Sequence, residues 1–289
     1  MDKPQFFITD VFTDKKYGGN QLATFYRCES LSDSDMQSIA REINFSETTF
    51  ITGNKDDSFS VRIFTPKEEI PFAGHPTLGT AHVIKNRLGL STDDTVLLDL
   101  KIGKIPVEFS DSGELWMKQV VPVFAKTHDS KHFAEILGLE PAHLVERHPV
   151  QTVSTGFPTT IVPLKNTAAL KEIKINKDLY FSYVENEESK IFLVFAPGGY
   201  EADQTLGVRV FADYFGIEED AATGSSNGAL AAYLSKHQVL QQKKIDIKVG
   251  QGYEMGRPST LLLRTQSTND QIQVYVGGRV VDVAQGTWA

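Results

Sequence analysis

Two glycine-containing segments, one in each half of the chain, have residue types that could bind a small anion. The first contains Gly74 and His75 and precedes the helical run LGTAHVI, while the second contains Gly224 and Ser225 and precedes GALAAYL. The first N–H groups of a helix lack partners within the helix and lie at the positive end of its dipole. Each segment therefore predicts an anion site at a helix start.

The expected helix starts differ in their residues. Pro76 is typical of the first position of a helix, and Ser225 or Ser226 is favoured as the N-cap of the second helix. The alternative is that both are ordinary capped helices without a ligand. An internal repeat favours the anion-site interpretation: Val61-Arg62-Ile63-Phe64 precedes the first segment and Val208-Arg209-Val210-Phe211 the second.

A weaker repeat aligns GGNQLATF (18–25) with TGFPTTIV (155–162). Two repeats in the same order indicate duplication, and their long period excludes a solenoid. We therefore expect two similar domains facing each other across a cleft, which is a common place for a ligand.

Glu47 is the candidate acid–base residue. It lies in the strand-like segment FSETTFI (45–51), where alternation places it on one face with Phe45, Thr49 and Ile51. On a partly apolar face, a desolvated carboxyl with a raised pKa could give and take a proton near neutral pH. The alternative is an exposed strand glutamate.

Other chemistries fit less well. The segment 224–228 matches the G-x-S-x-G pattern of a hydrolase nucleophile at Ser226, but the preceding EEDAAT does not read as a strand. His237 is the one later histidine, and no acidic residue separates it from Ser226. His75 and His82 lack a third metal ligand nearby, so we predict no metal site.

The pattern of elements predicts an α+β fold. Strands are expected at 5–12, 21–26, 45–51, 58–64, 95–110, 115–120, 159–164, 191–196, 206–211, 245–249, 260–264, 272–276 and 279–284. Helices are expected from Ser32 to near Asn44 and from Ser130 to Leu137, besides those after the glycine segments. We place the domains at 1–120 and 121–278, with the strand at 279–289 a candidate to return to the first domain.

Composition limits the partners and the compartment. A net charge of −8 and the lack of any Lys/Arg run argue against a nucleic acid or an acidic membrane surface. No segment approaches the 18 or so apolar residues of a membrane span. A single cysteine, Cys28, forms no internal disulfide and favours a reducing, cytoplasmic location.

The motifs resemble those of the PhzF-like isomerases, named for the phenazine-biosynthesis isomerase. The similarity is carried in order by FSETTFI, PFAGHPTLGTAHVI, EEDAATGSSNGALAAYL, QGYEMGRPS and VGGRVV, from Gly19 to Val281. The resemblance implies a diaminopimelate-epimerase-like fold, in which two similar domains each form a curled, mostly antiparallel sheet around a central helix. It also implies a homodimer and an isomerase that needs no metal or organic cofactor.

Residue by residue, the resemblance implies Glu47 as the acid–base group, His75, Asp220 and Ser225 as residues that hold a small carboxylate substrate, and Gly74 and Gly224 as donors of backbone amides. One departure is Gly19-Asn20-Gln21, because the family commonly has proline after Gly-Asn.

The wider fold includes racemases with two catalytic thiols, one in each glycine turn. Ala73 and Thr223 stand at those positions, so one carboxyl acting in an allylic isomerisation fits better. A non-catalytic small-anion binder is the alternative from another class, and a serine hydrolase fits less well.

Overall fold

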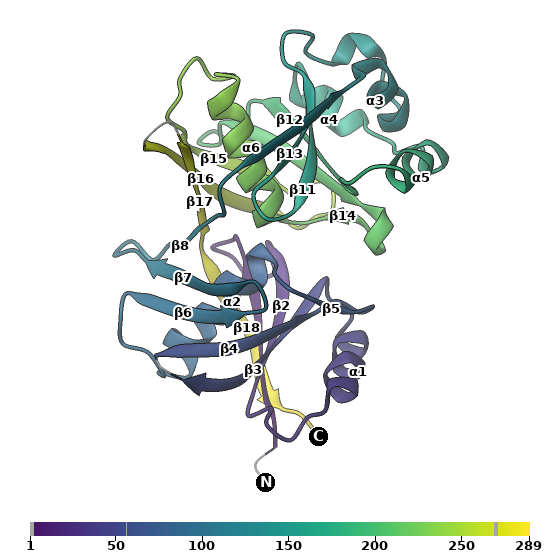
Figure 1. Cartoon of the computed structure of the whole chain (residues 1–289). Coiled ribbons are helices and arrows are strands. Elements are labelled where there is room, and N and C mark those ends of the chain that lie inside the picture. The colour runs from purple at the N-terminus through teal and green to yellow at the C-terminus, as the bar shows by residue number, and fades with distance from the viewer. Residues whose placement is uncertain (1–2, 56, 269–270) are drawn as a thin grey trace. The chain divides into compact units, whose positions relative to one another are not determined.

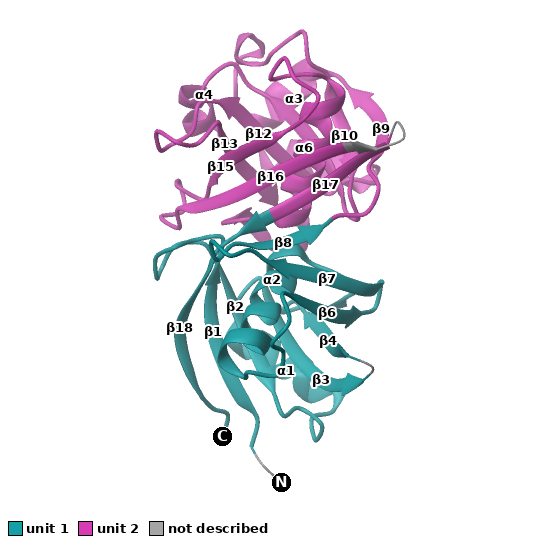
Figure 2. Cartoon of the chain, turned by 90° about the vertical axis from the view of Figure 1, so that its left-hand side faces the viewer, with its two compact units in different colours: residues 1–118, 277–289 teal, residues 119–276 magenta. Residues whose placement is uncertain are grey.

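The computed structural model describes residues 3–55, 57–268 and 271–289, which form two compact units (Figure 2). Unit 1 is Met1–Lys118 with Gly277–Ala289, and unit 2 is Gln119–Val276. The chain thus leaves the first unit after β8 and returns to it with its last strand. Each unit is described by itself below.

Unit 1 is a curled sheet around one helix (Figure 1). Its strands are β1 (Gln5–Val11), β2 (Asn20–Tyr26), β3 (Glu47–Lys55), β4 (Ser58–Phe64), β5 (Glu69–Ile70), β6 (Thr95–Leu100), β7 (Gly103–Phe109), β8 (Leu115–Lys118) and β18 (Val280–Thr287). Its helices are α1 (Asp33–Ile43) and α2 (Gly74–His82), and α2 continues into a π-helical turn at Val83–Arg87. Every residue of α2 is buried, because the helix packs against β1, β2, β3, β6, β7, β8 and β18.

Unit 2 has the same plan around a different helix. Its strands are β9 (Val123–His128), β10 (Val150–Ser154), β11 (Pro158–Pro163), β12 (Ile191–Pro197), β13 (Leu206–Ala212), β14 (Ile217–Asp220), β15 (Asp246–Gln251), β16 (Ser259–Thr268) and β17 (Gln271–Gly278). Its helices are α3 (Ser130–Leu137), α4 (Thr167–Glu172), α5 (Lys177–Glu185) and α6 (Gly224–Lys236). The central helix is α6, which packs against β10, β11, β12 and β16.

The strand pairings repeat between the units. In unit 1, β1–β2 is antiparallel, β2–β3 parallel, β3–β4 and β4–β5 antiparallel, β4–β6 parallel and β6–β7 antiparallel. In unit 2, β10–β11, β11–β12, β12–β13, β13–β14, β13–β15 and β15–β16 have the same directions in the same order. The predicted α+β class, with a curled and mostly antiparallel sheet around a helix in each unit, is confirmed.

Local sequence features explain where several helices begin and end. Ser32 caps α1 and forms a capping box with Asp35, while Asn44 ends the helix in the left-handed conformation. Gly138 ends α3 in the same conformation. The sequence did not predict β5, β9, β10, β14, α4 or α5.

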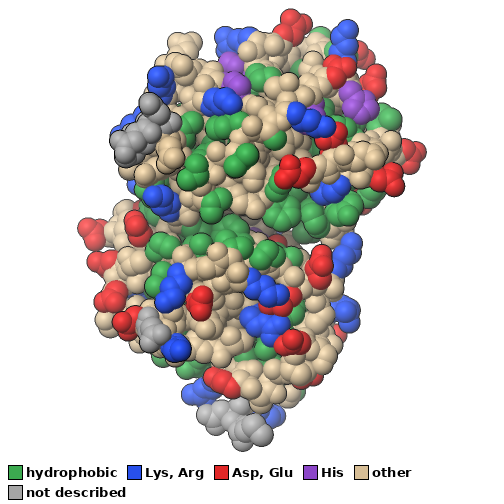
Figure 3. Space-filling view, in the orientation of Figure 1, with side chains coloured by type: hydrophobic (Ala, Val, Ile, Leu, Met, Phe, Trp, Pro, Cys, Tyr) green, Lys and Arg blue, Asp and Glu red, His purple; other side chains and the backbone are tan. Residues whose placement is uncertain are grey.

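The surface is mixed in charge. On the face in Figure 3, Lys and Arg side chains are interspersed with Asp and Glu and form no continuous basic patch. None of the helices in the described part of the chain has the length and apolarity needed to cross a membrane.

Candidate functional site

Glu47 lies at the start of β3, beside the beginning of α2. Its side chain is 14% exposed, and its Oε2 atom is 3.4 Å from Nε2 of His75. In the parallel pairing of β2 with β3, Glu47 stands opposite Leu22, which is fully buried. The predicted acid–base residue is therefore a largely buried carboxyl next to a histidine.

His75 is buried, and its ring is oriented by Asn20. The amide nitrogen of Asn20 lies 3.2 Å from Nδ1 of His75. Nδ1 is thus the ring nitrogen that Asn20 contacts, and Nε2 is the ring nitrogen that faces Glu47. Burial lowers the pKa of His75 to about 3, so at neutral pH the contact joins a carboxyl to a neutral ring and is not an ion pair.

A glycine turn brings Asn20 to this position. Gly19 has a φ of +63°, and a Cβ at this residue would lie 2.3 Å from the carbonyl oxygen of Val11. Glycine tolerates both the left-handed conformation and the close approach. The turn thus places Asn20 at the first position of β2, where it contacts His75.

The start of α2 differs from the prediction. Gly74 is its first residue, so Pro76 is the third and not the first. Ala73 is the N-cap, and its side chain forms no capping hydrogen bond. The amides of Gly74 and His75 therefore begin the helix without a side-chain cap, as an anion site at a helix start requires.

The start of α6 in unit 2 is similar, and here too the predicted cap was wrong. Thr223 is the N-cap, Gly224 and Ser225 are the first two residues of the helix, and Thr223 forms no capping hydrogen bond through its side chain. Ser225 and Ser226 lie inside the first turn because Thr223 already has the extended conformation of a cap. Gly224 and Ser225 are both buried.

The Thr223 hydroxyl instead donates a short hydrogen bond to Oδ2 of Asp220, the last residue of β14. Gln251 holds this turn together from β15. Its Nε2 donates to the Asp220 carbonyl at 2.8 Å, and its Oε1 accepts from the Thr223 amide at 3.3 Å. Gln251 is fully buried, so Asp220 and the start of α6 are held by one amide side chain.

Gln251 and Asn20 were missed as candidate residues. Both lie in motifs noted in the sequence, Gln251 in QGYEMGRPS and Asn20 in GGNQLATF. The motifs carried no indication that these amides would contact the candidate site residues, because each contact joins distant parts of the chain.

Equivalent Arg–Glu pairs hold the two short strands that lead into the helices. Arg62 donates two hydrogen bonds of 2.9 Å to Glu69 on β5. Arg209 donates bonds of 2.9 and 2.7 Å to Glu219 on β14. A bidentate Arg–carboxylate pair is geometrically specific, so each pair fixes its short strand beside β4 or β13.

The six predicted site residues fall into two groups, one in each unit. Glu47, Gly74 and His75 cluster in unit 1. Asp220, Gly224 and Ser225 cluster in unit 2. Each unit supplies a helix start without a side-chain cap, but only unit 1 adds a buried carboxyl beside a histidine.

The geometry does not support a hydrolase. A strand, β14, does precede the glycine turn, contrary to the expectation from EEDAAT, but Ser226 is fully buried and its hydroxyl is 3.0 Å from that of Thr159. His237 ends α6 and bonds to Gln151 at 2.8 Å. Ser226 and the C-cap His237 are eleven positions apart along the helix, roughly 16 Å.

His82 has structural partners. Its Nε2 lies 3.2 Å from Asp282, and its Nδ1 lies 3.0 Å from the amide of Asn86. Within the described ranges, no group of three or more His, Cys, Asp or Glu side chains is placed to hold a metal ion.

Comparison with known proteins extends these observations to the whole chain. The family model described as phenazine biosynthesis-like protein matches residues 9–286. The chain is 32% identical over 289 residues to trans-2,3-dihydro-3-hydroxyanthranilate isomerase of Pseudomonas aeruginosa, covering 98% of each.

Solved structures agree with this similarity. A PhzF-family phenazine biosynthesis protein of Bacillus anthracis superposes with a TM-score of 0.92 at 25% identity, with 100% of both chains covered. A probable proline racemase of Agrobacterium radiobacter has a TM-score of 0.64 at 11% identity and covers 99% of this chain and 93% of its own. The racemase shares the fold alone.

Many relatives are named isomerases, and the family match spans nearly all of the chain that carries Glu47 and both helix starts. The protein is therefore an isomerase of the phenazine biosynthesis-like (PhzF) family.

Proposed function

We propose that the protein moves a proton between two carbons of a small conjugated carboxylate, with Glu47 as the acid–base group and without a metal or organic cofactor. The observation that carries the proposal is the Glu47–His75 contact, a largely buried carboxyl 3.4 Å from a histidine at a helix start. A carboxyl in such surroundings is suited to general acid–base catalysis.

The reaction has two proton steps and is balanced. The Glu47 carboxylate takes a proton as a C–H bond of the substrate breaks, and the electron pair moves into the conjugated system. The protonated carboxyl then gives a proton to a different carbon, so the substrate is isomerised with no change in composition. No redox partner is required.

The remaining predicted residues would bind the substrate. Gly74 and Gly224 would donate backbone amides at the helix starts, and His75, Asp220 and Ser225 would orient polar groups of the substrate. The neutral state of His75 supports this role, because a neutral ring leaves Glu47 free to change its protonation state without breaking an ion pair.

The named relatives suggest a first substrate. Trans-2,3-dihydro-3-hydroxyanthranilate, the compound in their name, is a small carboxylate of the proposed class.

We further propose a homodimer in the cytoplasm. The free, buried Cys28 is compatible with a reducing compartment, and light scattering after gel filtration tests the oligomeric state.

The test compares wild type with Glu47→Gln on that compound. We expect the variant to lose about 10²–10⁴-fold in turnover with little change in melting temperature, because Gln keeps the shape but cannot transfer the proton. Glu42→Gln, on the exposed face of α1, is the matched control and should keep full activity. Near-wild-type turnover by Glu47→Gln contradicts the assignment, whereas binding without turnover by wild type favours the non-catalytic binder.

A further inference from the structure

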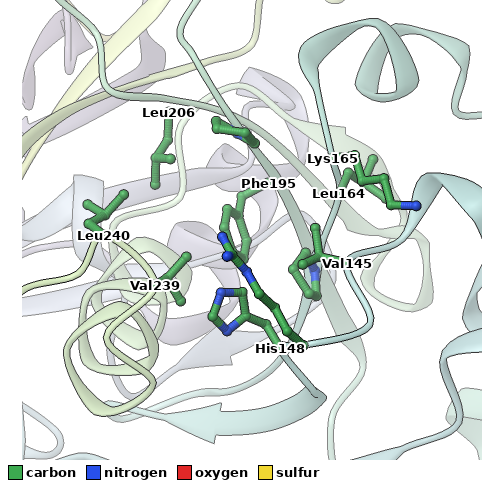
Figure 4. Close-up of a pocket in the computed structure, with 11 residues that line it drawn as sticks. Val145, His148, Leu164, Lys165, Phe195, Leu206, Val239 and Leu240 are labelled. Carbon is green, nitrogen blue, oxygen red and sulfur yellow. The ribbon is translucent and has the colours of Figure 1, made fainter.

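A cavity in unit 2 lies away from all of the predicted site residues. It encloses about 320 Å³, at the lower end of the roughly 300–1,000 Å³ typical of small-molecule sites. Its apolar lining is Val145, Leu164, Phe195, Leu206, Val239 and Leu240 (Figure 4). These residues come from the segment before β10, from the residue after β11, from β12 and β13, and from the chain that follows α6.

All of the charged or titratable side chains that line this cavity are basic. They are Arg147, His148 and Lys165, and no acidic residue lines it. This basic lining contrasts with the net charge of −8 of the whole protein. Figure 4 places the His148 ring beside the apolar residues and Lys165 at the edge, with its amine turned outward.

His148 and Arg147 leave polar atoms available to a ligand. Nε2 of His148 is buried and has no hydrogen-bond partner among the residues that the structure describes. Burial and the nearby charge of Arg147 lower the pKa of His148, so the ring alone supplies no charge at neutral pH. Within the same described ranges, neither Arg147 nor Lys165 forms an ion pair.

We propose that this cavity is a second binding site, which takes a small carboxylic acid with a short hydrocarbon body. The body would cover the half-buried Val145, Val239 and Leu240, and the carboxylate would meet Arg147 and Nε2 of His148. Lys165 would add attraction from the edge. The proposal is independent of the isomerase mechanism, because the cavity lies at the C-terminal end of α6, roughly 20 Å along the helix from Gly224.

The test uses octanoate and its neutral analogue octanamide, followed by amide NMR of the full chain. We expect saturable shifts for octanoate at residues 145–148, 164–165 and 239–240, and binding of octanamide at least tenfold weaker. Arg147→Gln with Lys165→Gln should reduce octanoate binding to the level of octanamide. Lys171→Gln, an exposed lysine on α4, is the matched control and should bind as wild type.

Two more variants separate this site from others. Val239→Gln should weaken both ligands, because it removes apolar contact, and Glu47→Gln should leave octanoate binding unchanged whether or not Glu47 is catalytic. Melting temperatures verify that each variant is folded. Equal affinity for the two ligands, no saturable binding, or shifts confined to Gly224 and Ser225 would overturn the proposal.

Discussion

The contact between Glu47 and His75 joins a largely buried carboxyl to a ring that Asn20 holds from its other side. Asn20 contacts the ring nitrogen that is turned away from the carboxyl, and burial keeps the ring neutral. A neutral ring has one nitrogen that donates and one that accepts, so it can contact Glu47 or a substrate without a change of charge. In the proposed mechanism, the histidine therefore orients the substrate and the glutamate transfers the proton.

Substitution of His75 tests that division of roles. We expect His75→Ala to lower kcat/KM by about 10²-fold, because a substrate that is no longer held in the reactive geometry commonly loses that much in rate. His75→Gln, which keeps an amide donor near the Nε2 position, should recover part of the loss. Steady-state kinetics on a turned-over substrate measure both, and equal activity of the Ala variant and wild type would remove His75 from the site.

Gly19 tests the turn that carries Asn20. Gly19→Ala should lower the free energy of unfolding by about 1–3 kcal/mol, because the residue is left-handed and its Cβ would collide with the Val11 carbonyl. Gly53→Ala is the control, since a Cβ there meets nothing within 4 Å. Urea unfolding measures both changes, and a similar small effect for the two variants would contradict this explanation.

At the scale of elements, each helix start depends on the short strand before it. β5 has two residues, and β14 pairs with β13 at two positions with an irregularity between them. Strand pairings this short contribute little stability by themselves. The Arg62–Glu69 and Arg209–Glu219 pairs therefore position the chain that enters α2 and α6.

Glu219→Gln tests this positioning role. We expect a loss on the order of 3 kcal/mol in the free energy of unfolding, because Arg209, with 9% of its side chain exposed, loses its partner charge. Hydrogen exchange should increase mainly at residues 217–224. The control is Asp246→Asn in the exposed pair with Arg264, which should change stability by less than about 0.5 kcal/mol. Faster exchange spread evenly through unit 2 would indicate a purely structural role.

The elements that could be predicted are those with local determinants. Ser32 and Asp35 at the start of α1 and Gly138 at the end of α3 act within one turn of helix, so the sequence alone indicates both boundaries. The strand β14 was missed because its acidic residues disfavour a strand, and Glu219 is stabilised there by Arg209 from another strand. The cap of α6 was misplaced for a related reason.

At α6, the distant Gln251 holds Thr223 in place, so the local preference of Ser225 for an N-cap does not decide where the helix begins. The same limit applies to the candidate site. Family motifs supplied its residues, but the orientation of His75 by Asn20 is a contact across 55 residues of sequence.

For the whole molecule, buried histidines predict sensitivity to acid. The pKa is lowered, mainly by burial, at His75, His82, His128, His148 and His237. Below pH of about 6.5 the unfolded chain takes up protons that the folded chain does not, so stability falls as the pH falls.

Glu69 acts in the same direction at lower pH. Hydrogen bonds from Arg62 lower the pKa of Glu69 to about 2, so its contribution to the free energy of unfolding is lost as the pH falls from about 4.5 through about 2.

Urea unfolding between pH 7.5 and pH 4 measures this dependence. Each histidine that stays neutral in the folded state should contribute up to about 1.4 kcal/mol per pH unit, and His75→Gln should make the dependence shallower. Stability that is constant or rises on acidification would contradict the lowered pKa values.

The central claim is that Glu47 carries the proton in a cofactor-independent isomerisation. The most direct measurement is incubation of a metabolite extract in deuterated water with wild-type protein or with Glu47→Gln, followed by mass spectrometry. We predict a compound that gains one mass unit with wild type and not with the variant, because a proton held by Glu47 exchanges with solvent before it returns to carbon. The same mass gain with Glu47→Gln at a near-wild-type rate would contradict the account.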